Sequence, residues 1–498
     1  MTENTLSRRA VLGGLIAAAT GAGASAAART PKAARARPPN IVFFLGEGLR
    51  YDEFSFRGNP LLKTPNMDRL AREGALFRNA FVTNALCLPS RASFLTGAYS
   101  HTTGATTNED NQVPARFALV SDVLREQGYE IGFVGKSHVG GALLDHKWDY
   151  YFGFKGQADY LKPEVVEGSN GQYGEPEIYH EYVDDLLTRK AVEWVQGRSE
   201  KPFCLFLWFY APHAPFYRPR RMLQRFNGDK VPVPANFDDD LKGYPGKARA
   251  VAQADNKVGT SQVFYDDPRS LEELMKNHYV GVESNDEDVG KVVAALGPRL
   301  NETVILLSSD HGFFLGEHTF YDKRLMYEPS IRVPMMIRYP ELIAAGTVRD
   351  EMVLNIDAPV TLLDIVGIKA PATMQGRSFL PLARGHALPD WRTDWLYEYY
   401  EYPGFENVRP HRGVRTERYK YIHFFLEPQE FELYDLQTDP DEDHNLYGKP
   451  GYEDLTDRLR NRLQELRRET NDQYVYHPSR VLRLKAVPEV TPQPGGGK

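Results

Sequence analysis

Carboxylate and imidazole side chains follow two apolar runs of the chain, where they could bind a metal ion. Asp310 and His311 come near the end of "ETVILLSSDHG", and Glu47 comes directly after "NIVFFLG". Two carboxylates and one imidazole offer oxygen and nitrogen ligands to a divalent cation, and a bound cation lowers the pKa of a coordinated hydroxyl. The alternative for an Asp-His-Gly triplet is a simple turn. Metal binding is favoured if the two runs end side by side.

Two further apolar runs end in basic side chains. Lys136 and His138 follow the run that begins "GYEIGFVG", and His213 ends "KPFCLFLWFYAPH". Runs of this kind suit strands buried on both faces, and helices are predicted between them over 65–77, 121–127 and 286–297. The alternation predicts an α/β fold with a large, mostly parallel central sheet flanked by helices. Because ligand sites of such sheets lie beyond the carboxyl ends of the strands, the ionisable residues of all four runs are expected to converge.

Cys87 is one of only two cysteines in 498 residues, and it lies in "TNALCLPSRASFLTG". The second, Cys204, lies inside an apolar run and is predicted to be a small buried hydrophobic residue of a strand. A disulfide between the two is the alternative, since exported proteins commonly form disulfides.

The segment "CLPSR" has the C-x-P-S-R form of the type I sulfatases, which belong to the alkaline phosphatase superfamily. Further segments resemble this family in the expected order: "GYEIGFVGKSH", "APHAPF", "SSDHGFFLGEHTFYDKRLMYEPSIRVP" and "LYDLQTDPDEDHNL". The resemblance runs from Asn40 to Tyr447, most of the chain. It implies a sulfatase, a sulfuric ester hydrolase that releases inorganic sulfate from a sulfate monoester.

For Cys87 the resemblance implies a change of chemistry. In the family this cysteine is oxidised to Cα-formylglycine by a formylglycine-generating enzyme, and the hydrated aldehyde carries two hydroxyls. One hydroxyl attacks the sulfur of the ester and the alcohol departs. The other hydroxyl, once deprotonated, expels sulfate from the sulfated intermediate and restores the aldehyde. The implied cofactor is one divalent cation, expected to be Ca²⁺ with Mg²⁺ as the alternative. Its ligands would be Glu47, the modified Cys87, Asp310 and His311.

The resemblance also implies roles for five basic residues. Arg91 would brace the formylglycine, while Lys136 and Lys323 would hold sulfate oxygens, because sulfuryl transfer needs positive charge around the transferring group. His138 would hydrogen-bond the formylglycine hydroxyl and help its deprotonation. His213 would contact sulfate and protonate the leaving oxygen. Away from the motif, either lysine would be an ordinary surface charge.

The first metal segment departs from the family pattern. Relatives usually carry two consecutive aspartates after the first strand, whereas this chain has Glu47 followed by Gly48. A glutamate can ligate a hard cation, but Gly48 offers no side chain. The sequence leaves four consequences open: weaker metal binding, completion of the site by water, a different metal, or loss of activity.

Four regions are predicted along the chain. Residues 1–30, with Arg8 and Arg9 before an Ala/Gly-rich run, resemble a twin-arginine signal peptide, so the protein is expected to be periplasmic or secreted. The glycines of that run make a stable membrane span unfavourable. Residues 39–388 are predicted to form the catalytic domain, 389–485 an α+β subdomain with a small antiparallel sheet, and 486–498 a disordered tail. His411 and Arg412 are candidates for the mouth of the site.

Net charge and the predicted export signal limit the classes of molecule that this protein is expected to bind. The net charge of −7 disfavours nucleic-acid binding, which needs a basic surface. The export signal and the long middle loops favour a sulfated carbohydrate as substrate, with small sulfate esters as an alternative. The alternative functions are a phosphonate monoester or phosphodiester hydrolase of the same superfamily, and an inactive binding homologue that has lost its metal.

Overall fold

The computed structural model describes residues 37–109, 113–139, 148–154, 156–198, 200–239, 241, 247–258, 271–404 and 406–478. The predicted signal peptide and the C-terminal tail lie outside these ranges. The described residues from Pro38 onward form one compact unit. Within the described residues, no helix combines the length and apolar character that a bilayer crossing needs.

Five parallel strands form the centre of a large sheet. In spatial order they are β10 (Thr303–Ser309), β1 (Asn40–Gly46), β9 (Phe203–Trp208), β4 (Glu130–Lys136) and β5 (Tyr150–Phe154). Every residue of β1, β9 and β10 is buried, as expected for strands covered on both faces. The predicted parallel α/β sheet is confirmed.

Among the described residues, six further strands extend this sheet on both sides of the central five. They are β14 (Met335–Arg338), β2 (Ala75–Phe77) and β15 (Thr347–Arg349) beyond β10, and β6 (Glu164–Ser169), β7 (Gln172–Tyr173) and β8 (Glu177–Ile178) beyond β5. The predicted helix over 65–77 is wrong at its end, because Ala75 and Leu76 pair antiparallel with β14. Tertiary strand pairing overrides the local helical pattern there.

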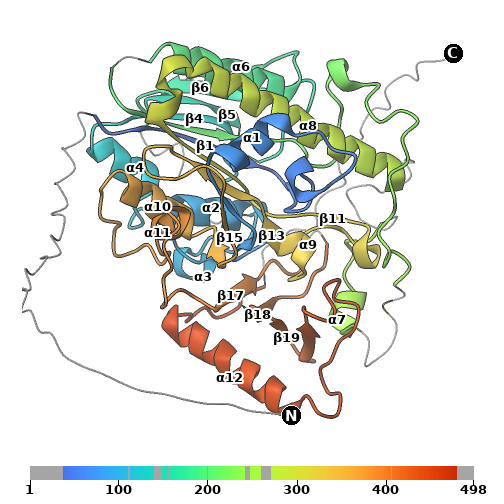
Figure 1. Ribbon diagram of the computed structural model, residues 1–498. Helices are drawn as coiled ribbons and strands as arrows, with labels where there is room; N and C mark the ends of the chain where they lie inside the picture. Colours follow the sequence, from blue (N-terminus) through green and yellow to red (C-terminus); the bar gives the residue numbers. More distant parts are fainter. Residues whose placement is uncertain are drawn as a thin grey trace, which may run out of the picture. The chain divides into compact units, whose positions relative to one another are not determined.

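Helices cover both faces of the sheet (Figure 1). On one face lie α1 (Pro65–Glu73), α6 (Val183–Gln196) and α8 (Leu271–Ala295), and on the other lie α2 (Cys87–Thr96), α4 (Val120–Glu126) and α10 (Asp357–Ile365). Strand β1 serves both cores. Val42 and Phe44 pack toward the first set of helices, while Phe43 and its alternate neighbours pack toward the second.

A separate four-stranded antiparallel sheet follows near the C-terminus. Its strands are β17 (Asp394–Tyr399), β18 (His411–Thr416), β19 (Tyr419–Phe424) and β20 (Glu430–Asp435), paired in chain order. Helix α12 (Glu453–Glu469) lies beside this sheet (Figure 1). It buries Leu459, Leu463 and Leu466 against the core. The predicted small antiparallel sheet is confirmed, while the domain boundaries remain a prediction.

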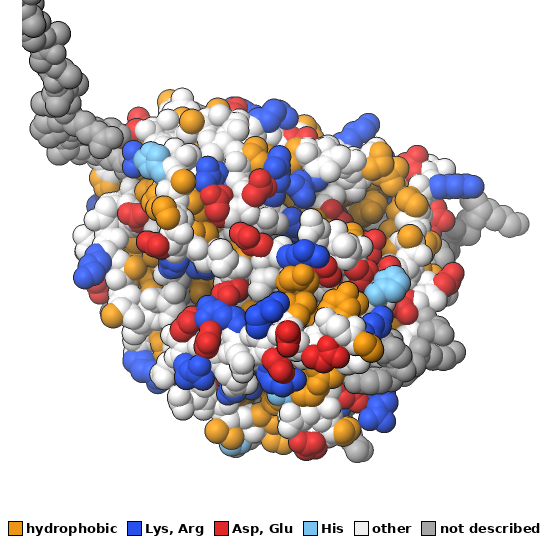
Figure 2. All heavy atoms as spheres, turned by 60° about the horizontal axis from the view of Figure 1, so that its bottom comes forward, with side chains coloured by type: hydrophobic (Ala, Val, Ile, Leu, Met, Phe, Trp, Pro, Cys, Tyr) orange, Lys and Arg blue, Asp and Glu red, His pale blue; other side chains and the backbone are white. Residues whose placement is uncertain are grey.

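Small elements connect these layers. They are the short strands β3 (Ala80–Phe81), β11 (Phe314–Leu315), β12 (Tyr321–Asp322), β13 (Arg332–Val333) and β16 (Val353–Leu354), and the short helices α3 (Ser100–Thr103), α7 (Arg249–Ala252), α9 (Glu328–Ile331) and α11 (Leu380–Ala383). Acidic and basic side chains lie interspersed on the face shown in Figure 2.

Candidate active site

The carboxyl ends of the four predicted strands lie next to one another at one end of the parallel sheet. Gly46 of β1 pairs with Ser309 of β10, so the next residues, Glu47 and Asp310, leave the sheet side by side. Strands β9 and β4 lie on the other side of β1, and β4 ends at Lys136. The topology therefore brings together the ionisable residues that were predicted to converge.

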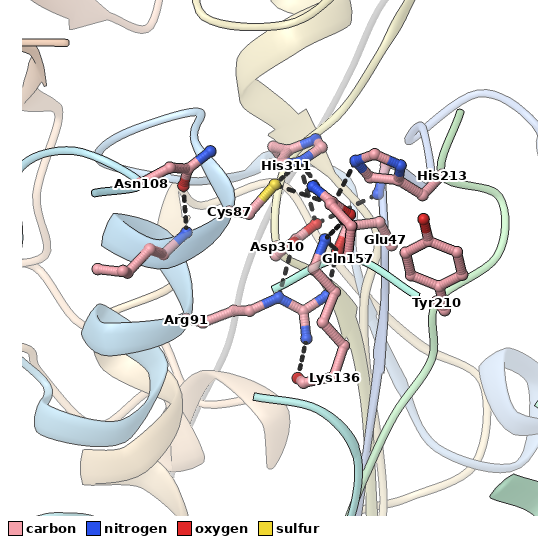
Figure 3. A network of polar contacts seen from close by, with 12 residues as sticks. Glu47, Cys87, Arg91, Asn108, Lys136, Gln157, Tyr210, His213, Asp310 and His311 are labelled. Atoms are coloured by element: carbon pink, nitrogen blue, oxygen red, sulfur yellow. Dashed lines mark hydrogen bonds and ion pairs between the residues drawn. The ribbon is translucent and has the colours of Figure 1, made fainter. Parts of the chain in front are cut away.

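Helix α2 brings Cys87 to this edge as its first residue. The side chain of Asn108 accepts a hydrogen bond from the backbone N–H of Leu88 at 2.9 Å and so satisfies one free donor of the first turn (Figure 3). Pro89 suits a first turn, where its missing N–H costs nothing. Because the helix begins at Cys87, the positive end of its dipole lies at the sulfur atom.

Arg91 lies one turn after Cys87 and is completely buried. Its guanidinium donates to Asp310 Oδ2 at 2.9 Å, to the carbonyl oxygen of Lys136 at 2.7 Å and to Glu47 Oε2 at 2.5 Å. Its carbon Cζ lies 5.4 Å from the centre of the Trp208 ring. Arg91 therefore joins two carboxylates and the end of β4.

Four buried side chains can act together as metal ligands. Oxygen, sulfur and nitrogen atoms of Glu47, Cys87, Asp310 and His311 all lie within 4.8 Å of one another. Cys87 Sγ is 2.9 Å from Glu47 Oε1 and 3.4 Å from His311 Nε2, and that nitrogen is 3.4 Å from Asp310 Oδ1. His311 Nδ1 donates to the carbonyl oxygen of Gly312 at 2.7 Å, which leaves the lone pair of Nε2 for a cation.

The electrostatics of this group fit a cation. Burial, assisted by Glu47, raises the pKa of Asp310 to about 7. Burial lowers the pKa of His311, but the interactions with Asp310 and Cys87 together outweigh it and raise that pKa to about 9. Burial also raises the pKa of Glu47, yet Lys136 and Arg91 hold it well below its ordinary value. Because two carboxylates compete for limited positive charge, a divalent ion placed among them would be stabilised.

Two buried lysines flank the sulfur atom of Cys87. Lys136 Nζ lies 2.9 Å from Glu47 Oε2 and 3.2 Å from Gln157 Oε1, and Lys323 Nζ lies 2.9 Å from Asp322 Oδ1. Burial and Glu47 raise the pKa of the Cys87 thiol, but Lys136, Lys323 and His311 outweigh them and lower it well below its ordinary value. The pocket around this sulfur therefore favours a negatively charged group.

Both predicted histidines face the sulfur atom of Cys87. His213 stacks on the ring of Tyr210, with centroids 5.3 Å apart, and its Nε2 lies 3.8 Å from Glu47 Oε1. His138 adopts a positive φ of 52°, and its Nδ1 has no hydrogen-bond partner among the described residues. Burial lowers the pKa of each imidazole, assisted at His213 by Lys136.

Gly48 follows Glu47, where the resemblance predicts a second aspartate. Its N–H donates to Asp310 Oδ1 at 3.2 Å, and its φ is +78°. A Cβ atom there would lie 3.6 Å from His311 Cε1 and 3.1 Å from Phe313 Cδ2. A side chain at Gly48 would therefore face the ring of His311.

Several polar residues of the site were not predicted. Asp322 and Arg324 flank Lys323 and form a buried ion pair, and Glu401 is buried and accepts from the N–H of Asn108 at 2.7 Å. The quoted family segment contains Asp322 and Arg324, so that motif offered a signal for them. Tyr210 directly precedes "APHAPF", another quoted family segment, so that motif offered a signal for Tyr210 as well. Asn108, Gln157 and Glu401 belong to no motif, and only the fold brings them to the site.

The structure excludes the alternative pairing of the two cysteines. Cys204 lies within β9 and pairs with Ile41 and Ile131 of the neighbouring strands, whereas Cys87 lies at the edge of the sheet. Both are buried, free thiols. The disulfide hypothesis is wrong, and Cys204 is a buried strand residue as predicted.

Sequence and structure comparisons identify the family of this chain. The sequence model described as Sulfatase matches residues 39–368, and the one described as N-sulphoglucosamine sulphohydrolase, C-terminal, matches residues 316–469. An N-acetylglucosamine-6-O-sulfatase of Bacteroides thetaiotaomicron is 32% identical over 90% of this chain and 89% of its own.

Two solved structures extend these comparisons. A structure in complex with its substrate D-glucosamine-2-N,6-O-disulfate superposes with a TM-score of 0.80 at 30% identity, over 88% of this chain and 99% of the other. A phosphonate monoester hydrolase of Agrobacterium radiobacter shares the fold, with a TM-score of 0.70 at 20% identity over 87% and 96% of the two chains. The chain therefore belongs to the sulfatase family of sulfuric ester hydrolases.

Proposed function

We propose that this protein hydrolyses the sulfate ester of a sulfated glucosamine to the free sugar hydroxyl and inorganic sulfate. The observation that carries the proposal is the buried group of Glu47, Cys87, Asp310 and His311, with two lysines beside the sulfur atom. The substrate class rests on the relatives, one described as an N-acetylglucosamine-6-O-sulfatase and another in complex with a glucosamine disulfate.

Glu47, Cys87, Asp310 and His311 would hold one divalent cation, Ca²⁺ by preference, since carboxylate oxygens dominate the donor set. The cation would lower the pKa of a bound hydroxyl and draw charge from the sulfate oxygens. Cys87 would carry the formylglycine that a formylglycine-generating enzyme makes, and its hydrate would supply the attacking hydroxyl. Gly48 leaves room for water or a substrate oxygen in place of a second aspartate.

The remaining residues position the ester and move protons. Lys136 and Lys323 would hold sulfate oxygens, and the burial of both makes each interaction stronger than it would be in water. His138 would hydrogen-bond the hydroxyl at position 87, consistent with the unpartnered Nδ1 of its buried ring. His213, whose side chain is 13% exposed, would give a proton to the leaving oxygen at the open side of the site.

The Asp322–Arg324 pair would bind the sugar. Both residues are buried next to Lys323, and Arg324 Nε has no hydrogen-bond partner among the described residues. A carboxylate and a guanidinium side by side offer acceptors and donors to neighbouring hydroxyls. This arrangement favours a carbohydrate over a small aryl sulfate as the natural substrate.

The cellular setting is part of the proposal. The signal over residues 1–30 would export the folded enzyme to the periplasm or the medium. Formylglycine formation at Cys87 would then precede export. The catalytic region over 39–388 would carry the site residues, and the 389–485 subdomain would supply Glu401 at its margin.

The test begins with protein made together with a formylglycine-generating enzyme. Mass spectrometry of the peptide spanning Cys87 should show loss of H₂S and gain of one oxygen, and sulfate release from N-acetylglucosamine-6-sulfate should depend on added calcium. Cys87→Ala should release none. An unmodified thiol, or faster turnover of a matched phosphonate monoester than of the sulfate, contradicts the proposal. Calcium binding without turnover of any ester would favour the inactive homologue.

A further inference from the structure

His213 is carried by a tight turn that follows β9. After Phe209, whose N–H donates to Leu45 O at 2.9 Å, the chain leaves the sheet, and His213 N–H donates to Tyr210 O at 2.9 Å. The sheet therefore does not hold the backbone N–H groups of the intervening residues. How firmly the His213 ring is held in place depends on the contacts that fix this turn.

A buried carboxylate from α6 holds the turn from one side. Asp184 Oδ1 accepts from the N–H of Tyr210 at 2.9 Å, and Oδ2 accepts from the N–H of Ala211 at 2.7 Å. Asp184 is the second residue of α6 and is completely buried. Both oxygens of the carboxylate are thus used on two consecutive backbone donors.

Helix α8 holds the same turn from the other side. Asn285 Nδ2 donates to the carbonyl oxygen of Ala211 at 2.6 Å. Gly281, one turn earlier on α8, lets the helix approach Pro212 closely, since a Cβ there would lie 2.7 Å from Pro212 Cβ. The turn is therefore clamped between two helices that lie side by side on one face of the sheet (Figure 1).

The burial of Asp184 is energetically unfavourable in itself. Burial raises the pKa of Asp184 to about 8, Asp288 and Asp185 add to the rise, and the bonds from Tyr210 and Ala211 oppose it. Among the ion pairs of the described residues none involves Asp184. In an asparagine one of the two carboxyl oxygens would be replaced by an NH₂ donor facing a backbone N–H, whereas a carboxylate presents an acceptor oxygen to each N–H.

We propose that Asp184 is a positioning residue for His213. It fixes the peptide groups of Tyr210 and Ala211, and the Tyr210 ring in turn stacks on the imidazole at an interplanar angle of 17°. His213 Nδ1 contacts the carbonyl oxygen of Ala214 at 2.5 Å, which orients Nε2 toward the metal group. The inference rests on the proposed role of His213 as the proton donor to the leaving oxygen.

The test exploits the chemistry of the leaving group. A sugar alkoxide needs a proton as it departs, whereas p-nitrophenolate is stable without one. Asp184→Asn should lower kcat about tenfold or more on N-acetylglucosamine-6-sulfate, with KM changed less than about threefold, and should leave kcat on p-nitrophenyl sulfate within about threefold. Asp185→Asn is the matched control, because that neighbouring carboxylate forms a half-buried ion pair with Arg221 and accepts no hydrogen bond from the described residues of the turn.

A double-mutant cycle provides the second readout. If Asp184 acts through His213, Asp184→Asn should cause little further loss of sugar-sulfate turnover in a His213→Ala background. Additive losses, or equal losses on both esters, would overturn the inference. If Asp184→Asn yields too little folded protein, Asn285→Ala tests the same clamp from α8. Failure of the wild-type enzyme on every sulfate ester would refute the proposed function. If the wild type is active and the ratio of sugar-sulfate to p-nitrophenyl sulfate turnover is unchanged in Asp184→Asn and Asn285→Ala, only this inference is refuted.

Discussion

Glu47 and Arg91 form a completely buried ion pair, with 2.5 Å between Oε2 and Nη2. The two oxygens of this carboxylate have different partners. Oε2 also contacts Lys136 Nζ at 2.9 Å, while Oε1 lies 2.9 Å from Cys87 Sγ and 3.4 Å from His311 Nε2. Glu47 thus pairs with two cationic side chains through one oxygen, while the other oxygen faces Cys87 and His311.

Glu47→Gln should destabilise the protein as well as inactivate it. The amide leaves Arg91 and Lys136 buried with less opposing charge, and breaking a buried pair in this way costs about 3 kcal/mol or more. We expect sulfate release to fall at least about 100-fold. Denaturant unfolding and sulfate release measure the two effects. Glu193→Gln, which removes an exposed pair with Arg189, should change unfolding by less than about 1 kcal/mol, and equal stability of both variants would contradict the prediction.

Gly48→Asp should increase the affinity for calcium. A carboxylate at this position would face His311 and add a ligand, although the φ of +78° makes any side chain there cost about 1 kcal/mol of stability. Gly48→Ala shares the strained backbone and the crowding against Phe313 without the carboxylate. Calorimetric titration of calcium into the metal-free proteins should give tighter binding for the aspartate variant only. Equal affinities of the two variants would show that Gly48 lies outside the ligand sphere.

The strand ends of this site were predictable, because hydrophobic runs and the rule for open α/β sheets identify where side chains gather. The partners of Arg91 were not, since they come from the ends of three different strands. Asp184 and Asn285 lie in ordinary amphipathic helices, and nothing in their sequence context marks them. Only the fold shows that Asp184 accepts from the N–H of Ala211 and that Asn285 donates to its carbonyl oxygen. Pairing of β2 with β14 likewise depends on a strand more than 250 residues away.

Calcium should stabilise the protein through the group that contains Asp310. A cation that binds only the folded state at about 100 times its Kd adds about 2.7 kcal/mol to the unfolding free energy. We therefore expect the Tm to rise on adding calcium to the metal-free wild type and to fall again with chelator. In Asp310→Asn, which weakens the donor set and the bond to Arg91, the calcium-dependent rise should be smaller. An equal rise in both proteins would place the calcium elsewhere.

His411 should make the protein sensitive to mild acid. The sequence suggested this residue for the mouth of the site, but its ring is buried among Tyr397, Tyr399 and Phe424 and its Nδ1 contacts the carbonyl oxygen of Arg409 at 2.8 Å. Burial lowers the pKa of His411 to about 4. The His411 imidazole is therefore uncharged in the folded protein at neutral pH.

The pH dependence follows from linkage. Between pH 6.5 and about 4 the unfolded chain binds a proton at position 411 that the folded chain does not, so the unfolding free energy falls as the pH is lowered through this window. The contribution is on the order of 3 kcal/mol over the whole window. His411→Phe keeps an aromatic ring without a titrating group, so its unfolding free energy should fall less between pH 7 and 4 than that of the wild type. His444→Gln, on the surface, should follow the wild type, and parallel curves for His411→Phe and wild type would show that His411 is not buried as a neutral ring.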